Sequence, residues 1–211
     1  GKGLAVALGC HRQGAAVGLV LAVGNAAAPD ALMRQLQQEA LSAHLVRRYP
    51  GPSGQGAGWL AADGSNAILT FAGANALLDT AQVAASADAL ARAALVYGQF
   101  EVPQETVCAA FVLAREAGAC TVLNPSPWQR IESPLLAQTQ VIVVNEREAW
   151  QLLETADPAS SDWSAAVASL WPRWPGGLQR RLVVTLGARG SLSFEPAGHC
   201  EHTPAPCVTV R

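Results

Sequence analysis

The chain has 211 residues, 50% hydrophobic and 14% charged, with a formal net charge of −2 at pH 7. This length and apolar content fit one folded domain with a sizeable core, and they exclude an intrinsically disordered chain. The charge provides no basic surface for a nucleic acid, and the apolar runs are far shorter than the roughly 20 residues of a membrane span. We therefore expect no nucleic-acid partner and no membrane helix.

The five cysteines are scattered along the chain and include no C-x-x-C pair: Cys10, Cys108, Cys120, Cys200 and Cys207. An odd number at such spacing fits neither a disulfide framework nor a structural zinc site. We expect reduced, mostly buried thiols in a cytoplasmic protein.

Short apolar runs alternate with helical patterns along most of the chain. Strands are expected at 17–23, 95–101, 121–124, 141–145 and 182–186, and helices at 29–41, 103–119, 134–137, 146–154 and 161–171. This alternation predicts a doubly wound α/β domain over residues 1–211, with a mostly parallel sheet and helices on both faces. Ligands of such sheets bind at the carboxyl ends of the strands.

One segment, at about residues 47–72, has no helical period. Its apolar stretches 56–61 and 67–71 flank Asp63-Gly64-Ser65-Asn66, a sequence typical of hairpin turns. A β-hairpin that interrupts an α/β domain commonly forms a lid or an oligomer contact. We expect this hairpin to form a lid, or else to join two copies of the chain in a homodimer.

Several common catalytic signatures are missing from the sequence. Lys2 is the only lysine, so no P-loop can be formed, and no G-x-G-x-x-G follows a strand. No G-x-S-x-G elbow is present, and none of the four histidines is placed as a base, since His11 and His44 fall in expected helices and His199 and His202 in a polar tail. These patterns disfavour a P-loop enzyme, a Rossmann dehydrogenase and a serine hydrolase.

Four local patterns follow one another in a characteristic order. They are Gly1-Lys2-Gly3 opening a helix, Ala72-Gly73-Ala74-Asn75 after the hairpin, Glu101 at a strand end with Asn124-Pro125-Ser126-Pro127 after the next strand, and Asn145-Glu146-Arg147-Glu148 with Thr185-Leu186-Gly187-Ala188-Arg189-Gly190. Each is weak alone, but together they resemble the ribokinase-like (PfkB-type) sugar kinase family. The resemblance implies a transferase that moves phosphate from ATP to a sugar hydroxyl, most similar to the ribokinases. Nucleoside and phosphosugar kinases of the same family are the alternatives.

The resemblance also implies roles for individual residues. Sugar would be contacted by Gly1, Lys2, Gly3 and Glu101, and ATP by Asn145, Thr185, Leu186, Gly187, Ala188, Arg189 and Gly190, while Glu148 would hold Mg²⁺ through water. Plainer roles remain open: Lys2 as a solvated terminus, Glu101 as an acid at a helix start, Asn145 with Glu148 as a capping box, and the glycine loop as a strand-to-strand turn. A capping box is compatible with nucleotide binding.

The catalytic Asp that the resemblance implies would stand in a glycine-rich helix entry, after a strand expected at 207–210. None of the six Asp residues of this sequence lies in such an entry, so we expect no catalytic residue in this chain. Ala5 also stands where the sugar signature has Asn. We therefore expect the central part of a kinase, truncated at both ends and inactive alone, with any monovalent-cation site outside it. A non-catalytic nucleotide-binding or dimerising remnant is the alternative.

Overall fold

The computed structural model describes residues 1–25, 29–61, 66–154 and 163–207. The chain divides into two compact units, each of which is described by itself. Unit 1 comprises Gly1–Ala93 with Glu101–Leu113, and unit 2 comprises Ala94–Phe100 with Ala114–Arg211. The single domain expected over residues 1–211 stays a prediction.

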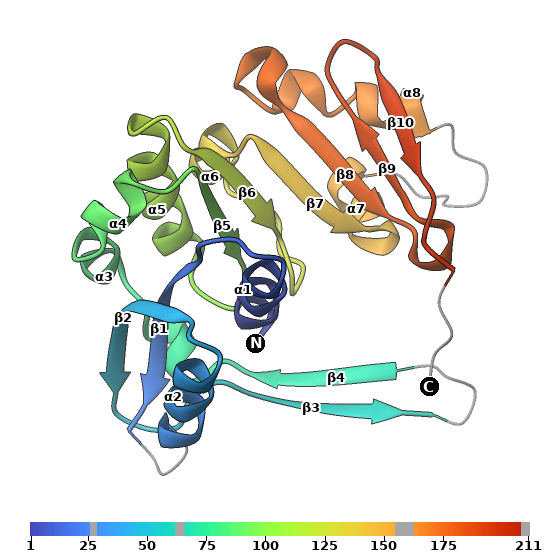
Figure 1. The fold of residues 1–211 in the computed structure, drawn as a ribbon. Helices are drawn as coiled ribbons and strands as arrows, with labels where there is room; N and C mark the ends of the chain where they lie inside the picture. Colours follow the sequence, from blue (N-terminus) through green and yellow to red (C-terminus); the bar gives the residue numbers. More distant parts are fainter. Residues whose placement is uncertain (26–28, 62–65, 155–162, 208–211) are drawn as a thin grey trace. The chain divides into compact units, whose positions relative to one another are not determined.

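Unit 1 contains a β-α-β element and a separate hairpin (Figure 1). Its elements are α1 (Lys2–Arg12), β1 (Gly18–Gly24), α2 (Pro29–Gln38), β2 (Ser42–Tyr49), β3 (Gln55–Leu60), β4 (Asn66–Phe71), the 3-10 turn η1 (Gly73–Leu77), α3 (Thr80–Ala84) and α4 (Ala87–Ala91). β1 and β2 pair in parallel, which requires a crossover connection such as the one through α2. Ala7, Leu19, Leu36 and Leu41 form a buried cluster that joins α1, β1 and α2.

The expected strand at 17–23 and helix at 29–41 are confirmed as β1 and α2, although α2 ends at Gln38. β2 was not predicted, and the placement of His44 in a helix is wrong because His44 lies in β2. The chain leaves the helix near Ala40, whose φ of 52° lies in the left-handed region and breaks the helical repeat.

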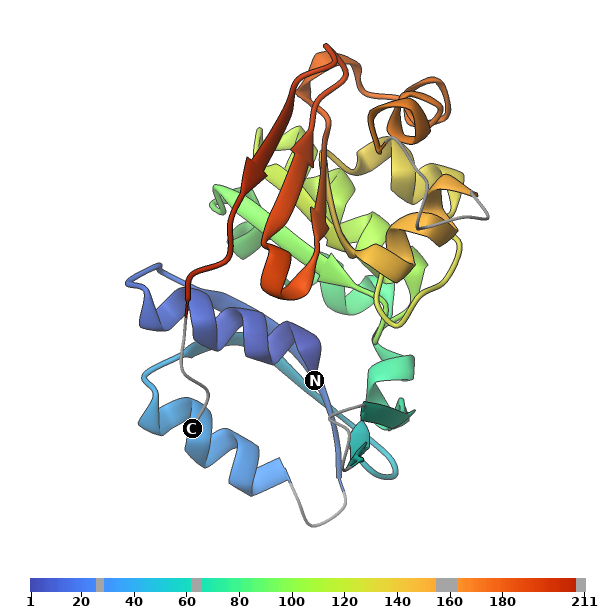
Figure 2. The same cartoon turned by 90° about the vertical axis from the view of Figure 1, so that its right-hand side faces the viewer.

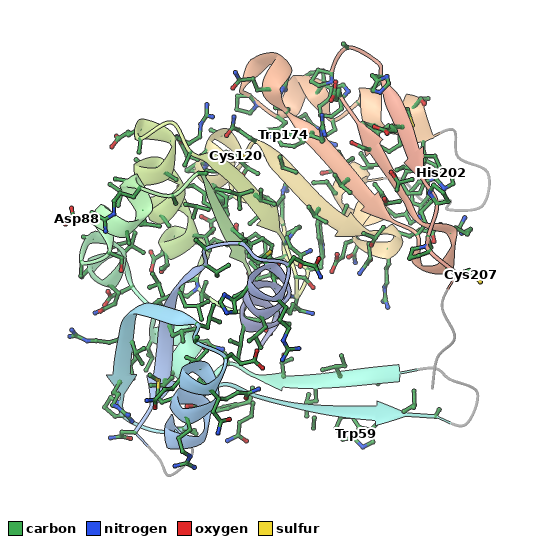
Figure 3. The ribbon with its side chains drawn as sticks, in the orientation of Figure 1. Trp59, Asp88, Cys120, Trp174, His202 and Cys207 are labelled. Atoms are coloured by element: carbon green, nitrogen blue, oxygen red, sulfur yellow. The ribbon has the colours of Figure 1, made fainter. Side chains whose placement is uncertain are left out.

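The expected hairpin is confirmed as the antiparallel pair β3 and β4, and the middle of its turn lies outside the described residues. Trp59 pairs with Ala67, Ala57 with Leu69 and Gln55 with Phe71, so these side chains share one face. The relative exposures are 58% for Trp59, 66% for Leu69 and 58% for Phe71. The hairpin thus carries an exposed apolar face, with Trp59 labelled in Figure 3.

Unit 2 contains a six-stranded sheet in the order β10-β9-β8-β7-β6-β5. From residue 95 on, the chain forms β5 (Leu95–Gln99), β6 (Cys120–Asn124), α6 (Ser133–Gln138), β7 (Val141–Asn145), α7 (Glu146–Leu153), α8 (Trp163–Ala168), η2 (Trp171–Arg173), η3 (Gly177–Gln179), β8 (Arg181–Thr185), η4 (Gly187–Arg189), β9 (Ser191–Phe194) and β10 (Cys200–Thr203). Helix α5 (Gln104–Glu116) follows β5 in the chain, and most of it belongs to unit 1. Strands β5 to β8 are parallel, and β9 and β10 are antiparallel. The predicted α/β fold with a mostly parallel sheet is confirmed.

Helices α7 and α8 lie on the same side of this sheet (Figure 2). The ring of Trp150 in α7 stacks on Trp163 of α8 at 4.2 Å, and Trp163 reaches Phe194 of β9 at 6.4 Å between ring centres. Trp174 is fully buried and donates its indole N–H to the carbonyl of Thr139 at 2.9 Å. The tryptophans of this region therefore form part of the core.

Two expectations for the second half of the chain need correction. The helix expected at 161–171 ends at Ala168, and Trp171 lies in the separate 3-10 turn η2. The polar tail contains the strands β9 and β10, and His202 lies in β10. All four residues of β10 are exposed, so this edge strand has no apolar alternation that a sequence pattern could detect. The strand expected at 207–210 falls almost wholly outside the described residues.

The expected buried thiols are not found. Cys10, Cys200 and Cys207 are exposed and the other two cysteines are half-buried, and none of the five forms a disulfide. The expectation of mostly buried thiols is wrong because Cys10 lies on an outer face of α1 and Cys200 on the exposed edge strand. Among the helices described, none is long and apolar enough to cross a membrane.

Candidate functional site

Two predicted sugar contacts meet at the start of α1 in unit 1. The backbone N–H of Lys2 donates a hydrogen bond to Oε2 of Glu101 at 2.7 Å, although the two residues are 99 positions apart. A Cβ atom built on Gly1 would lie 1.8 Å from the same Oε2. Gly1 therefore permits the close approach of the carboxylate to the first turn of the helix.

This contact gives Glu101 a structural role beside any contact with sugar. The N-cap Gly1 has no side chain to accept from the first helical amides, and the Glu101 carboxylate supplies that acceptor. The carboxylate also complements the positive end of the helix dipole. The simpler role for Glu101, an acid at a helix start, is thus present, but at α1 rather than at the helix that follows Glu101 in the chain.

In unit 2, two of the predicted nucleotide contacts end neighbouring strands. β7 and β8 pair in parallel with Asn145 opposite Thr185, so both residues lie at the carboxyl edge of the sheet. The backbone N–H of Glu148 donates to Oδ1 of Asn145 at 2.8 Å, and the N–H of Asn145 donates to Oε2 of Glu148 at 3.0 Å. The capping box, one of the plainer roles left open by the sequence, is therefore present.

The glycine loop after Thr185 is the 3-10 turn η4 between β8 and β9. The N–H of Leu186 donates to the carbonyl of Gly190 at 2.7 Å and closes the loop. Gly187 and Gly190 have φ values of 60° and 88°. A Cβ atom on Gly190 would lie 2.0 Å from the carbonyl oxygen of Thr203. Gly190 is thus required by this strand-to-strand turn, whether or not the loop binds phosphate.

Two residues outside the predicted site contact the loop. The guanidinium of Arg189 donates from Nη2 to both carboxylate oxygens of Glu146, at 2.8 and 2.7 Å. Nε2 of His202 lies 2.8 Å from the carbonyl oxygen of Arg189. Glu146 stands inside the Asn145–Glu148 pattern and could have been noticed there, whereas nothing in the sequence around His202 indicates its contact.

The residues at the start of α7 fit a hydrated Mg²⁺ ion. Glu148 is 7% exposed, and its carboxylate is fixed by the Asn145 amide. In the part of the chain that the structure describes, no group of three or more His, Cys, Asp or Glu could hold a metal ion directly. Mg²⁺ commonly keeps several waters and binds one or two carboxylates together with substrate phosphates. A single fixed carboxylate fits that type of binding, and the metal role of Glu148 stays a prediction.

No described Asp is placed as a catalytic base. Asp79 caps α3, where its carboxylate accepts from the Gln82 amide at 3.0 Å, and Asp88 lies in the first turn of α4 (Figure 3). Asp30 lies in α2. Asp63, Asp157 and Asp162 lie outside the described residues.

The sequence profile of the pfkB family carbohydrate kinases matches residues 1–211, the whole chain. The chain belongs to this family. It is 28% identical over 213 residues to the bifunctional ribokinase/ribose-5-phosphate isomerase A of Fructilactobacillus sanfranciscensis, covering 100% of this chain and 38% of the relative. It is 29% identical over 210 residues to the ribokinase of Staphylococcus aureus, covering 97% of this chain and 66% of the relative. The chain thus spans less than two thirds of the length of either relative.

The fold of this pfkB-family chain is also found in solved structures. The structure of Arabidopsis thaliana ribokinase complexed with ribose and ATP matches with a TM-score of 0.82 and 21% identity, covering 97% of this chain and 66% of that one. At this identity the match supports a ribokinase-like fold. The predicted sugar and nucleotide contacts stay predictions, although within each unit the structure brings several of them together.

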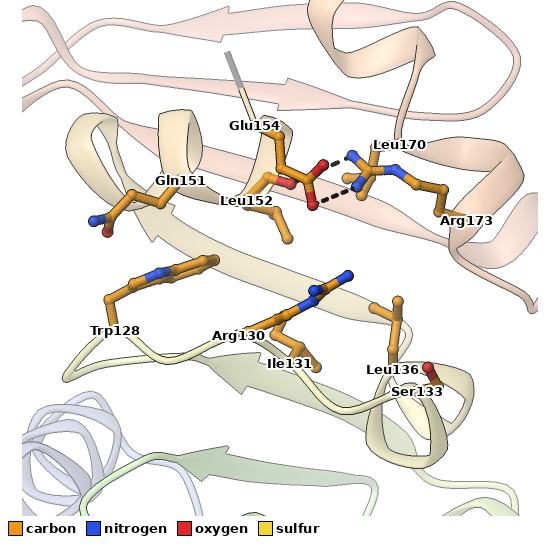
Figure 4. Close-up of a pocket in the computed structure, with 10 residues that line it drawn as sticks. All are labelled: Trp128, Arg130, Ile131, Ser133, Leu136, Gln151, Leu152, Glu154, Leu170 and Arg173. Atoms are coloured by element: carbon orange, nitrogen blue, oxygen red, sulfur yellow. Dashed lines mark hydrogen bonds and ion pairs between the residues drawn. The ribbon is translucent and has the colours of Figure 1, made fainter. Parts of the chain in front are cut away.

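A pocket of about 140 Å³ lies elsewhere in unit 2 of this pfkB-family chain (Figure 4). Trp128 and Arg130 face Glu154 and Arg173 across it, and the latter two form an ion pair at 3.1 Å. None of the predicted site residues lines this pocket. The candidate site therefore consists of the strand ends and loops described above.

Proposed function

We propose that residues 1–211 supply the sugar-contacting and nucleotide-contacting parts of an ATP-dependent kinase that phosphorylates a sugar hydroxyl, ribose first among the candidates. The observation that carries the proposal is the register of β7 and β8, which places Asn145 beside Thr185. The two family motifs that begin at these residues, 40 positions apart in the chain, therefore start at the same edge of the sheet. The relatives named ribokinase support ribose as the sugar.

On the sugar side, Glu101 is proposed to accept hydrogen bonds from sugar hydroxyls. A carboxylate can accept several hydrogen bonds through its two oxygens, and the Lys2 backbone N–H is one of the donors to Glu101. Gly1 and Gly3 carry no side chains of their own, so a sugar can approach the backbone closely at these two positions. The Lys2 ammonium adds a charged donor for hydroxyl or phosphate oxygens.

On the nucleotide side, Asn145 and the loop Thr185–Gly190 are proposed to bind ATP. Two glycines with positive φ shape this loop, so its backbone amides can approach phosphate oxygens without a Cβ in the way. Glu148 would hold Mg²⁺ through water, and the ion would neutralise charge on the phosphates.

Nucleotide binding by the purified chain tests this proposal. We expect heat of binding when a non-hydrolysable ATP analogue is titrated in the presence of Mg²⁺, and a weaker affinity without the ion. Glu148→Gln should remove the Mg²⁺ dependence, while Glu195→Gln, a carboxylate change elsewhere in unit 2, should leave it intact. Absence of nucleotide binding by the folded wild-type chain would reject the proposal.

Sugar preference is tested on the same chain. Ribose should bind more tightly than 2-deoxyribose or adenosine, and Glu101→Gln should weaken ribose binding because a neutral amide is a poorer acceptor. Tighter binding of adenosine would indicate a nucleoside kinase instead. We expect no phosphate transfer by the 211 residues alone, because none of their Asp residues occupies a glycine-rich helix entry. Turnover would contradict that expectation.

A second copy of the chain is the proposed partner of the β3–β4 hairpin. Trp59, Leu69 and Phe71 expose an apolar face whose burial would be favourable, and exposed ladder edges invite pairing with another strand. Sedimentation analysis should find a dimer, and Leu69→Lys should give a monomer of unchanged fold. A monomeric wild-type chain at high concentration would reject this partner.

A further inference from the structure

The Arg189–Glu146 pair sits at the entrance of the proposed nucleotide loop. Both distances, 2.8 and 2.7 Å, are those of a charge-assisted pair in which one nitrogen serves both oxygens. The side chains are 63% and 35% exposed, so the pair lies at the surface where a ligand can reach it. Arg189 belongs to the glycine loop, and Glu146 is the first residue of α7.

The position of Glu146 poses an electrostatic problem for a polyanionic ligand. The first turn of α7 contains two acids, Glu146 and Glu148, directly after Asn145. Negative charge near this helix start is favourable for the helix, but it repels the phosphates of a nucleotide bound nearby. Glu148 has a proposed use in holding Mg²⁺, whereas Glu146 has none. If phosphates bind nearby, a positive charge must therefore balance the negative charge of Glu146.

The backbone of Arg189 is fixed by contacts that direct its side chain. Its N–H donates to the carbonyl of Leu186 at 3.2 Å, and its own carbonyl lies 2.8 Å from Nε2 of His202 on β10. The neighbouring Gly190 packs against Thr203 so closely that no Cβ fits between them. The loop is thus held against β10 on one side while the guanidinium reaches α7 on the other.

We propose that the side chain of Arg189 aids nucleotide binding by neutralising Glu146, and that this guanidinium is a positioning group rather than a direct phosphate ligand. The pair ties the glycine loop to the first turn of α7 and removes an uncompensated negative charge beside the phosphates. His202 supports the same arrangement by holding the Arg189 carbonyl. This inference rests on the proposed function, because it assigns a role within nucleotide binding.

A charge-cancelling double variant separates the two roles of Arg189. Arg189→Gln alone leaves Glu146 uncompensated, so we expect affinity for the ATP analogue to fall about three- to tenfold, with a smaller loss for ADP and almost none for adenosine. This order follows the number of phosphates repelled. The double variant R189Q/E146Q removes both charges and should bind within about twofold of the wild type. The effect of R189Q should also shrink as salt is raised, because an exposed charge is screened.

The chain offers a matched control in the exposed ion pair between Arg181 and Glu195. This pair lies in the same unit, at the opposite end of β8, with side-chain exposures of 52% and 34%. R181Q/E195Q should leave nucleotide affinity unchanged, and circular dichroism should show all variants folded. His202→Ala should lower the affinity for the ATP analogue about twofold.

The outcomes are distinguishable. If R189Q/E146Q binds as weakly as R189Q, Arg189 is a direct phosphate ligand and the inference is wrong. The inference is also wrong if R189Q loses as much affinity for adenosine as for the ATP analogue, or if it loses no affinity for the ATP analogue. If the wild-type chain binds no nucleotide, the proposed function itself fails and the inference falls with it.

Discussion

The capping box at the start of α7 allows a structural role and a functional role to be measured separately. Two hydrogen bonds, at 2.8 and 3.0 Å, join Asn145 and Glu148, and Glu148 is only 7% exposed. Asn145→Ala removes the N-cap acceptor and should cost about 1 kcal/mol of stability. For a chain of this size, that loss lowers the melting temperature by about 2–4 °C. Glu148→Ala leaves the backbone N–H of Asn145 without its acceptor and should cost about 1–2 kcal/mol of stability.

Glu148→Gln is the discriminating variant. A glutamine amide oxygen can still accept from the Asn145 N–H, so stability should stay within about 0.5 kcal/mol of the wild type. The carboxylate charge proposed to hold Mg²⁺ is lost. Urea unfolding followed by tryptophan fluorescence suits this test, because Trp59 is the only one of the six tryptophans outside unit 2. If Glu148→Gln destabilises as much as Glu148→Ala, the native structure needs the charge itself, and the reasoning from the capping box is refuted.

Three further predictions concern other parts of the chain. Among the residues that the structure describes, none is a hydrogen-bond partner of the buried Tyr49 hydroxyl, and burial raises its pKa. Tyr49→Phe should therefore stabilise by about 1 kcal/mol and abolish a loss of stability above pH 10 in urea titrations. Gly190→Ala should destabilise by about 2 kcal/mol or more in thermal melts, because of its φ of 88° and the 2.0 Å approach of a Cβ to Thr203. The hydrogen bond from Arg12 lowers the pKa of Glu39, so Arg12→Gln should be less stable than the wild type above pH 4.5. This difference in stability should disappear in urea titrations at more acidic pH.

Local patterns predicted the parts of the fold that depend on local interactions. The strand at 141–145 was predicted correctly, and the capping box left open after it is present. An apolar run followed by Asn and then Glu three residues later has a specific backbone solution. β2 and β10 were missed for the opposite reason. β10 is exposed at every residue, so its pairing with β9 rather than its own side chains makes it a strand.

The contacts around the site also divide into those that the topology predicts and those for which the sequence holds no signal. The meeting of Asn145 with Thr185 follows from topology, because parallel neighbours in a β-α-β sheet bring their carboxyl ends to one edge. The contact between Glu101 and the Lys2 amide spans 99 residues and has no periodic or spacing signal. Sequence reasoning had placed both residues in one sugar site only through the family resemblance.

Residues that support the motifs follow a different logic from the motifs themselves. The two glycines of the loop are fixed by the turn that the backbone must make, so any chain with this turn needs similar residues there. Glu146 and His202 contact the loop from α7 and β10 without shaping that turn, and they are free to change provided that charge and hydrogen bonding are balanced elsewhere. Differences in nucleotide affinity between chains with the same loop are therefore expected to originate in such supporting pairs. In this chain, the Arg189–Glu146 pair is the place to look for them.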